Sequence, residues 1–425
     1  MILRNICKMG PDIKSIQTLA SNSVSPSDTW LIDFNKEMGL RPNGYGDLTV
    51  TYTSAFIKIF FDHTELSRTL RARELSLALY YEANFYWSVT NPLIFSGACP
   101  YYVTCYGVTK TCTFKDIEKL AQDKLEPTLT EKELRKNLLR NAAYMMRGKR
   151  QMPALTTVDP EDTLSEPEAV DLHYCCILNQ NMKDATVFSE WLKQRRDDRR
   201  NTMSAIWTTL FQIAIACYAL HLSQAAHNDL HSGNIYIKTV DPVKPVMYKV
   251  DDRVYGFEPK YVPYLFDFDR GYIKSIGENA INNGEHCVGY GQCNEAINNK
   301  DFIKSCCYFA RYIPELVPQL AEIIEKKPGS FKLIQKDVKC FLRTHEGKGL
   351  AFTGEWFLES FRSMSEIIPR MNFMIETRFG SSKIIGQKID VSDIHCLQST
   401  FFTSDGVLKP KLVVEQIVKL KERYG

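Results

Sequence analysis

The chain of 425 residues lacks a strong charge of either sign, because 53 Lys and Arg against 50 Asp and Glu leave a net charge of only +3. That balance gives no reason to expect a nucleic-acid partner. Residues 1–10 lack the apolar run and small residues of a signal peptide. Internal repeats are absent, and 44% hydrophobic and 24% charged residues are ordinary for globular proteins. We therefore expect a folded chain with a sizeable core.

The thirteen cysteines lack the spacing of a metal site. The densest group contains no C-x-x-C pair and consists of His286, Cys287, Cys293, Cys306 and Cys307. Their number is odd and no signal peptide precedes them, so reduced thiols in a cytoplasmic protein are expected rather than disulfides or zinc.

Formal charge is also absent from residues 201–226. A segment of this length could cross a membrane, which takes about 20 apolar residues. Thr, Ser, Gln and His residues interrupt it, however, and its fully apolar parts are short. The composition therefore favours a buried core helix over a membrane span.

Strings of β-branched and aromatic residues predict that the first 110 residues are rich in strands. The strings cover residues 29–34, 48–53 and 54–61, bounded by Ser, Pro, Gly and Asn clusters. Residues 65–89 follow with leucine and aromatic residues at spacings near 3.6, which predicts an amphipathic helix. Pro92 is expected to end that helical pattern soon afterwards.

The remainder of the chain divides by composition. Residues 111–170 combine a charged helical pattern with an acidic stretch that contains prolines, which predicts a solvated insertion. Residues 173–178 predict a buried strand, and the pattern from residue 301 onward is largely helical.

The segment HNDLHSGN, residues 227–234, directly follows the uncharged stretch. Phosphoryl transfer needs a carboxylate that accepts the proton of the incoming hydroxyl, and oxygen ligands that hold Mg²⁺ on the nucleotide phosphates. Asp229 suits the first role and Asn234 the second. Asp267, at the end of the strand-like string YVPYLFD, supplies a second metal-binding oxygen group.

In this order the two motifs resemble those of the protein-kinase-like superfamily. Residues 227–234 resemble its catalytic loop, and Asp267-Phe268-Asp269 resembles its DFG motif with Asp at the glycine position. The resemblance implies an α+β bilobal fold with a β-rich small lobe, a mainly helical large lobe, an insertion and a helical C-terminal extension. The corresponding segments are 1–110 for the small lobe, 111–170 for the insertion, 171–310 for the hinge and catalytic core, and 311–425 for the helical remainder. The uncharged helix then supports the catalytic loop, and no membrane span is expected.

The same resemblance implies roles for individual residues, with ATP and Mg²⁺ or Mn²⁺ as cofactors. Asp229 would be the base, with His227 and His231 as further catalytic-loop residues, and Asn234 and Asp267 would hold the metal. Lys58 lies in SAFIKIFF, which resembles the V-A-I-K string that holds the α- and β-phosphates.

The partner of Lys58 is expected on the following helix, where Glu82 is preferred over Glu74, with Glu65 also on that segment. Asp301 resembles the buried Asp that anchors the catalytic loop.

Two parts of the kinase pattern are weak. Small residues let backbone N–H groups approach phosphate, so Ser21, Asn22 and Ser23 are preferred as the phosphate-covering loop, with Gly44 and Gly46 as the alternative. The adenine-reading hinge is expected to follow the strand 173–178, at Leu178, Asn179 and Gln180. The sequence contains no A-P-E motif, and the segment 270–300, in the place of the activation loop, is short. Activation by phosphorylation is therefore not expected.

The acceptor remains open between several classes. His231 stands where Ser/Thr protein kinases usually have Lys, and D-L-H-x-G-N is equally typical of aminoglycoside and choline kinases. The sequence predicts an extra hairpin over residues 248–257. In this feature the chain is similar to Ser/Thr protein kinases of large nucleocytoplasmic DNA viruses. This likeness implies protein substrates and action in the host cytoplasm, with packaging in virions. Three alternatives are therefore open: a Ser/Thr protein kinase, a small-molecule kinase of the aminoglycoside or choline type, and a kinase-fold scaffold that has lost nucleotide binding.

Overall fold

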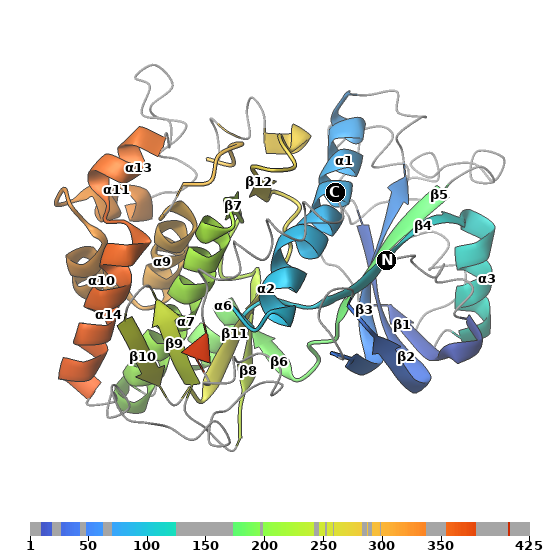
Figure 1. The fold of residues 1–425 in the computed structure, drawn as a ribbon, viewed down its shortest axis with the longest axis horizontal. Coiled ribbons are helices and arrows are strands. Elements are labelled where there is room, and N and C mark those ends of the chain that lie inside the picture. Colours follow the sequence, from blue (N-terminus) through green and yellow to red (C-terminus); the bar gives the residue numbers. More distant parts are fainter. Residues whose placement is uncertain are drawn as a thin grey trace. The chain divides into compact units, whose positions relative to one another are not determined.

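The structure is a computed structural model in which the chain forms two compact units (Figure 1). Unit 1 comprises Met1–Ala83 and Thr104–Met182, and unit 2 comprises Asn84–Val103 and Lys183–Gly425. The residues that the structure describes are 10–18, 27–42, 48–62, 70–124, 173–195, 199–241, 246–250, 253–257, 259–282, 287, 291–297, 299–336, 354–379 and 407–408.

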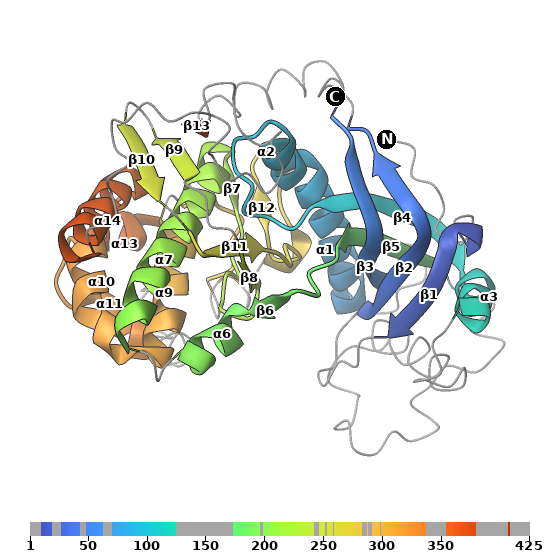
Figure 2. The same cartoon turned by 90° about the horizontal axis from the view of Figure 1, so that it is seen from below.

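Unit 1 is built on a five-stranded antiparallel sheet of order β1-β2-β3-β5-β4, whose strands lie side by side in Figure 2. The strands are β1 (Ile13–Thr18), β2 (Ser27–Leu40), β3 (Val50–Asp62), β4 (Cys105–Thr113) and β5 (His173–Gln180). The two predicted strings 48–53 and 54–61 merge into the single strand β3, because no Gly or Pro separates them. The predicted buried strand at residues 173–178 is confirmed as β5.

Two helices begin in unit 1. Helix α1 (Leu70–Phe85) lies within the predicted helix 65–89, and α3 (Phe114–Lys124) follows β4 directly. Helix α3 starts with a capping exchange, in which the Asp116 N–H donates to Thr113 Oγ1 and the Thr113 N–H donates to Asp116 Oδ2. Residues 111–113 of the predicted insertion thus complete β4, and residues 114–124 form α3, a helix in its charged part.

The segment after α1 corrects the expected effect of Pro92. A π-helical turn (η2, Tyr86–Thr90) leads into α2 (Asn91–Phe95), so the helical path continues beyond the proline. Pro92 is the second residue of α2 and directly follows the π-helical turn, within this continuous helical path.

Unit 2 has the uncharged stretch at its core, as α7 (Arg199–Leu222). Residues Met203–Leu222 are long and apolar enough for a membrane-spanning helix by length and composition, but 78% of the window concerned is buried inside the protein. Helix α14 packs against α7 (Figure 1). The other longer helices are α6 (Phe188–Arg195), α9 (Lys300–Tyr312), α10 (Val317–Ile324), α11 (Ser330–Lys336), α13 (Gly354–Ser360) and α14 (Met364–Phe379). The prediction of a buried core helix is confirmed.

Short strands in unit 2 position its loops. Strands β6 (Ala185–Val187), β8 (Ile235–Thr239) and β11 (Tyr261–Leu265) form a sheet of order β11-β8-β6, and β7 (Ala225–Ala226) pairs with β12 (Tyr272–Ile273). The extra hairpin is confirmed, because β9 (Val246–Val250) pairs antiparallel with β10 (Arg253–Phe257) and Val250 faces Arg253. Strand β13 (Val407–Leu408) joins β9 in a region expected to be helical.

The cysteines correct one expectation. Cys287 and Cys293 form a disulfide, so the thirteen cysteines are not all free thiols. Eight other cysteines within the described residues are buried and form no disulfide. Burial raises the pKa of both the Cys99 and the Cys105 thiols to about 12, which keeps them protonated at neutral pH.

The fold class implied by the resemblance is confirmed at the level of these elements. Unit 1 is a β-rich unit with helix α1 after its third strand, and unit 2 is mainly helical. The observed division differs from the predicted segments at Asn84–Val103, which belong to unit 2 rather than to the β-rich unit. Residues 125–172, the rest of the predicted insertion, lie outside the described part.

Candidate active site

In unit 1 the structure brings Lys58 together with Glu82. Lys58 lies in the middle of β3, between Thr29 of β2 and Ile177 of β5, and its Nζ is 2.7 Å from Glu82 Oε2 on α1. Only 12% of the Lys58 side chain and 1% of the Glu82 side chain are exposed. Because the two opposite charges lie at hydrogen-bonding distance in a largely buried position, each side chain holds the other in place.

Other predicted nucleotide-binding residues are not placed. Ser21, Asn22, Ser23, Gly44, Gly46 and Glu65 lie outside the described residues. Glu74 lies on α1, but its side chain is also outside the described part. Their roles stay predictions.

The predicted hinge residues lie inside β5 rather than after it. Leu178 pairs with Ile57 on one side and Gly107 on the other, and Asn179 is likewise paired on both sides. The Gln180 N–H donates to the Thr104 carbonyl at 2.8 Å. The strand therefore extends two residues beyond the expected end at residue 178, and the role of these three residues in reading adenine stays a prediction.

In unit 2 a single face of α9 anchors the predicted catalytic loop. Asp301 accepts hydrogen bonds from the backbone N–H groups of His227 at 2.6 Å and Asn228 at 2.8 Å. One turn later, Lys304 Nζ donates to the Asn228 carbonyl at 2.9 Å and Ser305 Oγ donates to the Leu230 carbonyl at 2.8 Å. The prediction that Asp301 anchors this loop is confirmed.

The α9 lysines are unusual in being buried. Lys300 is 1% and Lys304 is 3% exposed. Burial is the main cause that lowers the pKa of Lys300 to about 8, and it also lowers the pKa of Lys304, against the opposing charges of Asp229 and Asp301.

His227 is fully buried and contacts the segment that carries Asp267. Its Nε2 lies 2.9 Å from the Phe266 carbonyl, which can only accept, so Nε2 carries the hydrogen. Its ring also lies 4.7 Å from that of Phe268. This geometry suits a residue that positions the Phe266–Phe268 backbone rather than one that exchanges a proton with a substrate.

The two predicted metal ligands lie at the same end of one strand pair. Ile235 of β8 faces Leu265 of β11, and the Phe266 N–H donates to the Asn234 carbonyl at 3.2 Å. Asn234 immediately precedes β8 and Asp267 follows β11. Asp267 has a left-handed backbone with φ of 67°, and its N–H donates to the Tyr86 hydroxyl at 3.3 Å. A conformation this uncommon for a residue other than glycine is typical of functional sites.

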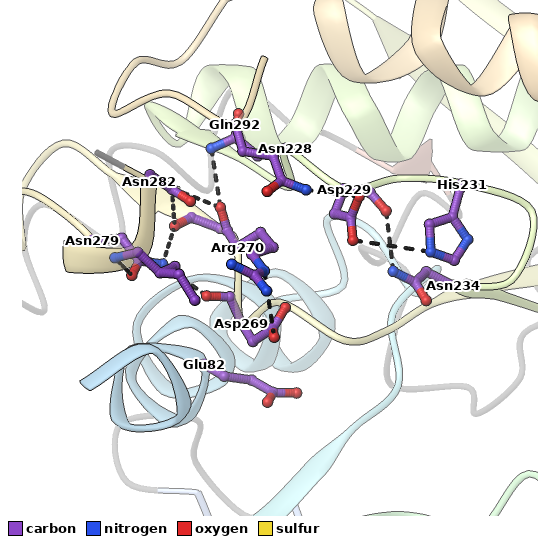
Figure 3. A network of polar contacts seen from close by, with 12 residues as sticks. Glu82, Asn228, Asp229, His231, Asn234, Asp269, Arg270, Asn279, Asn282 and Gln292 are labelled. Carbon is purple, nitrogen blue, oxygen red and sulfur yellow. Dashed lines mark hydrogen bonds and ion pairs between the residues drawn. The ribbon is translucent and has the colours of Figure 1, made fainter. Parts of the chain in front are cut away.

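The donor set fits Mg²⁺ or Mn²⁺. Asn234 Nδ2 donates to the Asp229 carbonyl at 3.0 Å, which fixes the amide so that Oδ1 is the group left to bind a cation (Figure 3). An amide oxygen together with the Asp267 carboxylate provides the hard oxygen ligands that these ions prefer. Within the described residues, there is no group of three or more His, Cys, Asp or Glu side chains that could hold a metal ion.

Asp229 is partly exposed and lies between two polar side chains. Gln292 Nε2 donates to its Oδ1 at 3.0 Å, and its Oδ2 lies 3.9 Å from His231 Nε2 (Figure 3). About a third of the Asp229 side chain, 30%, is open to solvent. A substrate hydroxyl can therefore reach this carboxylate.

His231 is held in one tautomer. Its Nδ1 accepts a hydrogen bond from the Gly233 N–H at 2.9 Å, so the hydrogen of the neutral ring is on Nε2, the atom nearer to Asp229. Burial, opposed by the charge of Asp229, lowers the pKa of His231, which favours the neutral ring at pH 7. His231 can thus donate a hydrogen bond beside Asp229 without carrying the charge of the usual Lys.

Amide side chains hold the segment after Asp267. Asn279 Nδ2 donates to the Asp269 and Gly271 carbonyls at 2.8 and 2.9 Å, and Asn282 Nδ2 donates to the Arg270 carbonyl at 2.8 Å (Figure 3). Both asparagines are buried. Hydrogen bonds from neutral amides therefore order this backbone within unit 2.

The sequence interpretation did not include Gln292, Lys304, Asn279 or Asn282. Gln292 and the two asparagines lie in residues 270–300, where the sequence predicted no individual role. Their roles depend on contacts across long sequence separations, which spacing does not encode. Lys304 could have been found from its position three residues after Asp301, on the same helix face.

No protein-family model matches the chain, and no curated protein matches it. Among solved structures, the chain is similar to WaaP in complex with acyl carrier protein, with 10% identity, 84% of this chain and 94% of that chain covered, and a TM-score of 0.30. It is also similar to the MAP kinase LmaMPK10 from Leishmania major, with 9% identity, 99% and 98% covered, and a TM-score of 0.36. Neither likeness is close enough to support a function. The kinase-like arrangement rests on the elements and contacts described above.

Proposed function

We propose that this protein is an ATP-dependent phosphotransferase, and specifically a Ser/Thr protein kinase. The main support is the loop 227–234, which α9 anchors through Asp301 and which presents the accessible Asp229 carboxylate beside Asn234. Phosphoryl transfer depends chiefly on such positioning and on electrostatic stabilisation.

In the proposed reaction, the acceptor hydroxyl oxygen forms a bond to the γ-phosphorus while the bond from that phosphorus to the β,γ-bridging oxygen breaks and ADP leaves. The hydroxyl proton passes to the Asp229 carboxylate. Asn234 and Asp267 would hold Mg²⁺, which when bound neutralises charge on the phosphates. Lys58, oriented by Glu82, would contact the α- and β-phosphates.

The reason to propose protein substrates is the extra β9–β10 hairpin, the feature in which the chain is similar to the viral kinases. On the same ground we propose that the protein is a viral enzyme that acts in the host cytoplasm or is packaged in the virion. A small-molecule kinase is the second candidate, favoured by the neutral His231 in place of Lys.

The test measures ADP release by the purified full chain with ATP and Mg²⁺, with casein, choline or an aminoglycoside as acceptor. The proposal expects turnover with casein and phosphate on Ser or Thr. Turnover only with a small alcohol would favour the second candidate. Asp229→Asn should abolish transfer, while the exposed Asp241→Asn should not.

The scaffold alternative predicts that the protein binds no nucleotide. Thermal unfolding with millimolar ATP and Mg²⁺ separates the two, because a ligand that binds only the folded state raises the melting temperature. The proposed function expects a rise, and an unchanged melting temperature together with absent turnover would favour the scaffold.

A further inference from the structure

The two oxygens of the Asp229 carboxylate have different surroundings. Oδ1 accepts the hydrogen bond from Gln292 Nε2, whereas Oδ2 is directed toward His231 Nε2 (Figure 3). A carboxylate on a short side chain can rotate about its last bond, and a donor fixed on one oxygen removes that freedom. Hydrogen bonds to ionised groups are among the stronger ones in proteins. Gln292 therefore sets which oxygen faces an incoming hydroxyl.

The backbone around Gln292 is fastened on both sides. The disulfide Cys287–Cys293 closes the segment that contains Gln292, and the Gly291 N–H donates to the Cys287 carbonyl at 2.9 Å. Gly291 takes a left-handed conformation with φ of 62°, which suits glycine in this turn. Gln292 itself is only 7% exposed.

A second contact ties this segment to the catalytic loop. Asn228 Nδ2 donates to the Cys293 carbonyl at 2.9 Å, and Asn228 directly precedes Asp229. The disulfide-closed segment thus contacts the loop through the backbone of Cys293 and through the side chain of Gln292. Because Gln292 and Cys293 are neighbours, the hydrogen bond of the Cys293 carbonyl to Asn228 limits how far the Gln292 side chain can move from Asp229.

We propose that Gln292 is a positioning residue for the phosphotransfer base Asp229, and that the Cys287–Cys293 disulfide holds Gln292 in place. This inference rests on the proposed function. Gln292 fixes Oδ1 so that Oδ2 receives the proton of the acceptor hydroxyl. Misplacement of a reacting group by about 1 Å can cost 10²-fold in rate, so loss of this single contact is expected to lower kcat about 10- to 100-fold.

The test compares Gln292→Met, which keeps the length but removes the donor, with Gln292→Glu, which adds a second carboxylate. Gln224→Met, at an exposed position of the same unit, is the matched control. We expect kcat to fall in Gln292→Met and further in Gln292→Glu, with KM for ATP within about twofold, because Gln292 acts through Asp229 and not on the nucleotide. Melting temperatures check that each variant is folded.

An unchanged kcat in Gln292→Met, or a raised KM for ATP with kcat kept, would overturn the inference. If Asp229→Asn keeps its activity, the proposed function itself fails. If Asp229→Asn is inactive and Gln292→Met is fully active, only the inference fails. The two failures are therefore distinguishable.

Reduction tests the role of the disulfide. Dithiothreitol opens the bond to two thiols and is itself oxidised to a cyclic disulfide, which mass spectrometry of the protein can verify. We expect wild-type kcat to fall several-fold after reduction, and Gln292→Met to show no further fall. Full activity of the verified reduced protein, or an equal fall in Gln292→Met, would overturn this part.

Discussion

Replacement of Asp301 by Asn should strongly destabilise unit 2. The carboxylate accepts hydrogen bonds from the N–H groups of His227 and Asn228, and only 6% of Asp301 is exposed. The amide has one acceptor oxygen, so one buried N–H loses its partner at about 1–3 kcal/mol. The other hydrogen bond falls from a charged one, worth about 1.5–3 kcal/mol, to a neutral one, worth about 0.5–1.5 kcal/mol, a loss of about 1–1.5 kcal/mol. The total loss is about 2–4.5 kcal/mol, a large part of the 5–15 kcal/mol typical of a folded domain.

Urea unfolding followed by tryptophan fluorescence measures this change, since Trp207 lies buried on α7 of the same unit. Asp241→Asn, which makes the same chemical change at an exposed position, is expected to stay within about 0.5 kcal/mol of wild type. Asp301→Asn should also lower phosphotransfer, because its hydrogen-bond partners, His227 and Asn228, directly precede Asp229. A loss of stability below about 1 kcal/mol would refute the reasoning that two buried N–H groups depend on this carboxylate.

Three further variants test other parts of the site. Glu82→Ala should destabilise unit 1 and raise KM for ATP, because it removes the carboxylate that lies 2.7 Å from the largely buried ammonium of Lys58; unchanged values in thermal unfolding and ATP titration would contradict this. In Gly233→Ala the new Cβ would lie 2.7 Å from His231 Cε1, so the ring must move and kcat should fall, whereas an unaltered kcat would show that the position of His231 is unimportant. Lys300→Met should stabilise the protein by roughly 3 kcal/mol at pH 7, because burial lowers the pKa of Lys300 from 10.5 to about 8. Between pH 8 and 10.5 the Lys300 side chain binds a proton in the unfolded chain but not in the folded one. The stability of the wild type relative to Lys300→Met should therefore rise as the pH rises through this window. A stability difference between the two proteins that does not change with pH would contradict this.

The site residues that were found from the sequence are those that belong to a short local motif. Lys58 was predicted from the likeness of SAFIKIFF to the V-A-I-K string, and the loop 227–234 combines residue types that suit phosphoryl transfer and resembles the kinase catalytic loop. The end of the strand was placed too early because Leu178, Asn179 and Gln180 extend β5, and the end of a strand depends on its neighbours' pairing rather than on its own residues.

Contacts between distant segments explain what the sequence did not reveal. The hydrogen bond from Gln292 to Asp229 crosses 63 residues. The disulfide between Cys287 and Cys293 was missed because the number and spacing of cysteines favoured free thiols. Strand β3 is the opposite case. Local composition correctly predicted strand structure for residues 48–53 and 54–61, and only the division into two strings was wrong.

The central claim is that Asp229 serves as the base of a phosphotransferase. Single-turnover transfer of the γ-phosphoryl group from ATP to casein, measured side by side for wild type and Asp229→Asn, tests it most directly. The account predicts phosphorylated Ser or Thr in the wild type and a rate lower by at least about 10²-fold in the variant. Equal rates in the two proteins would contradict it.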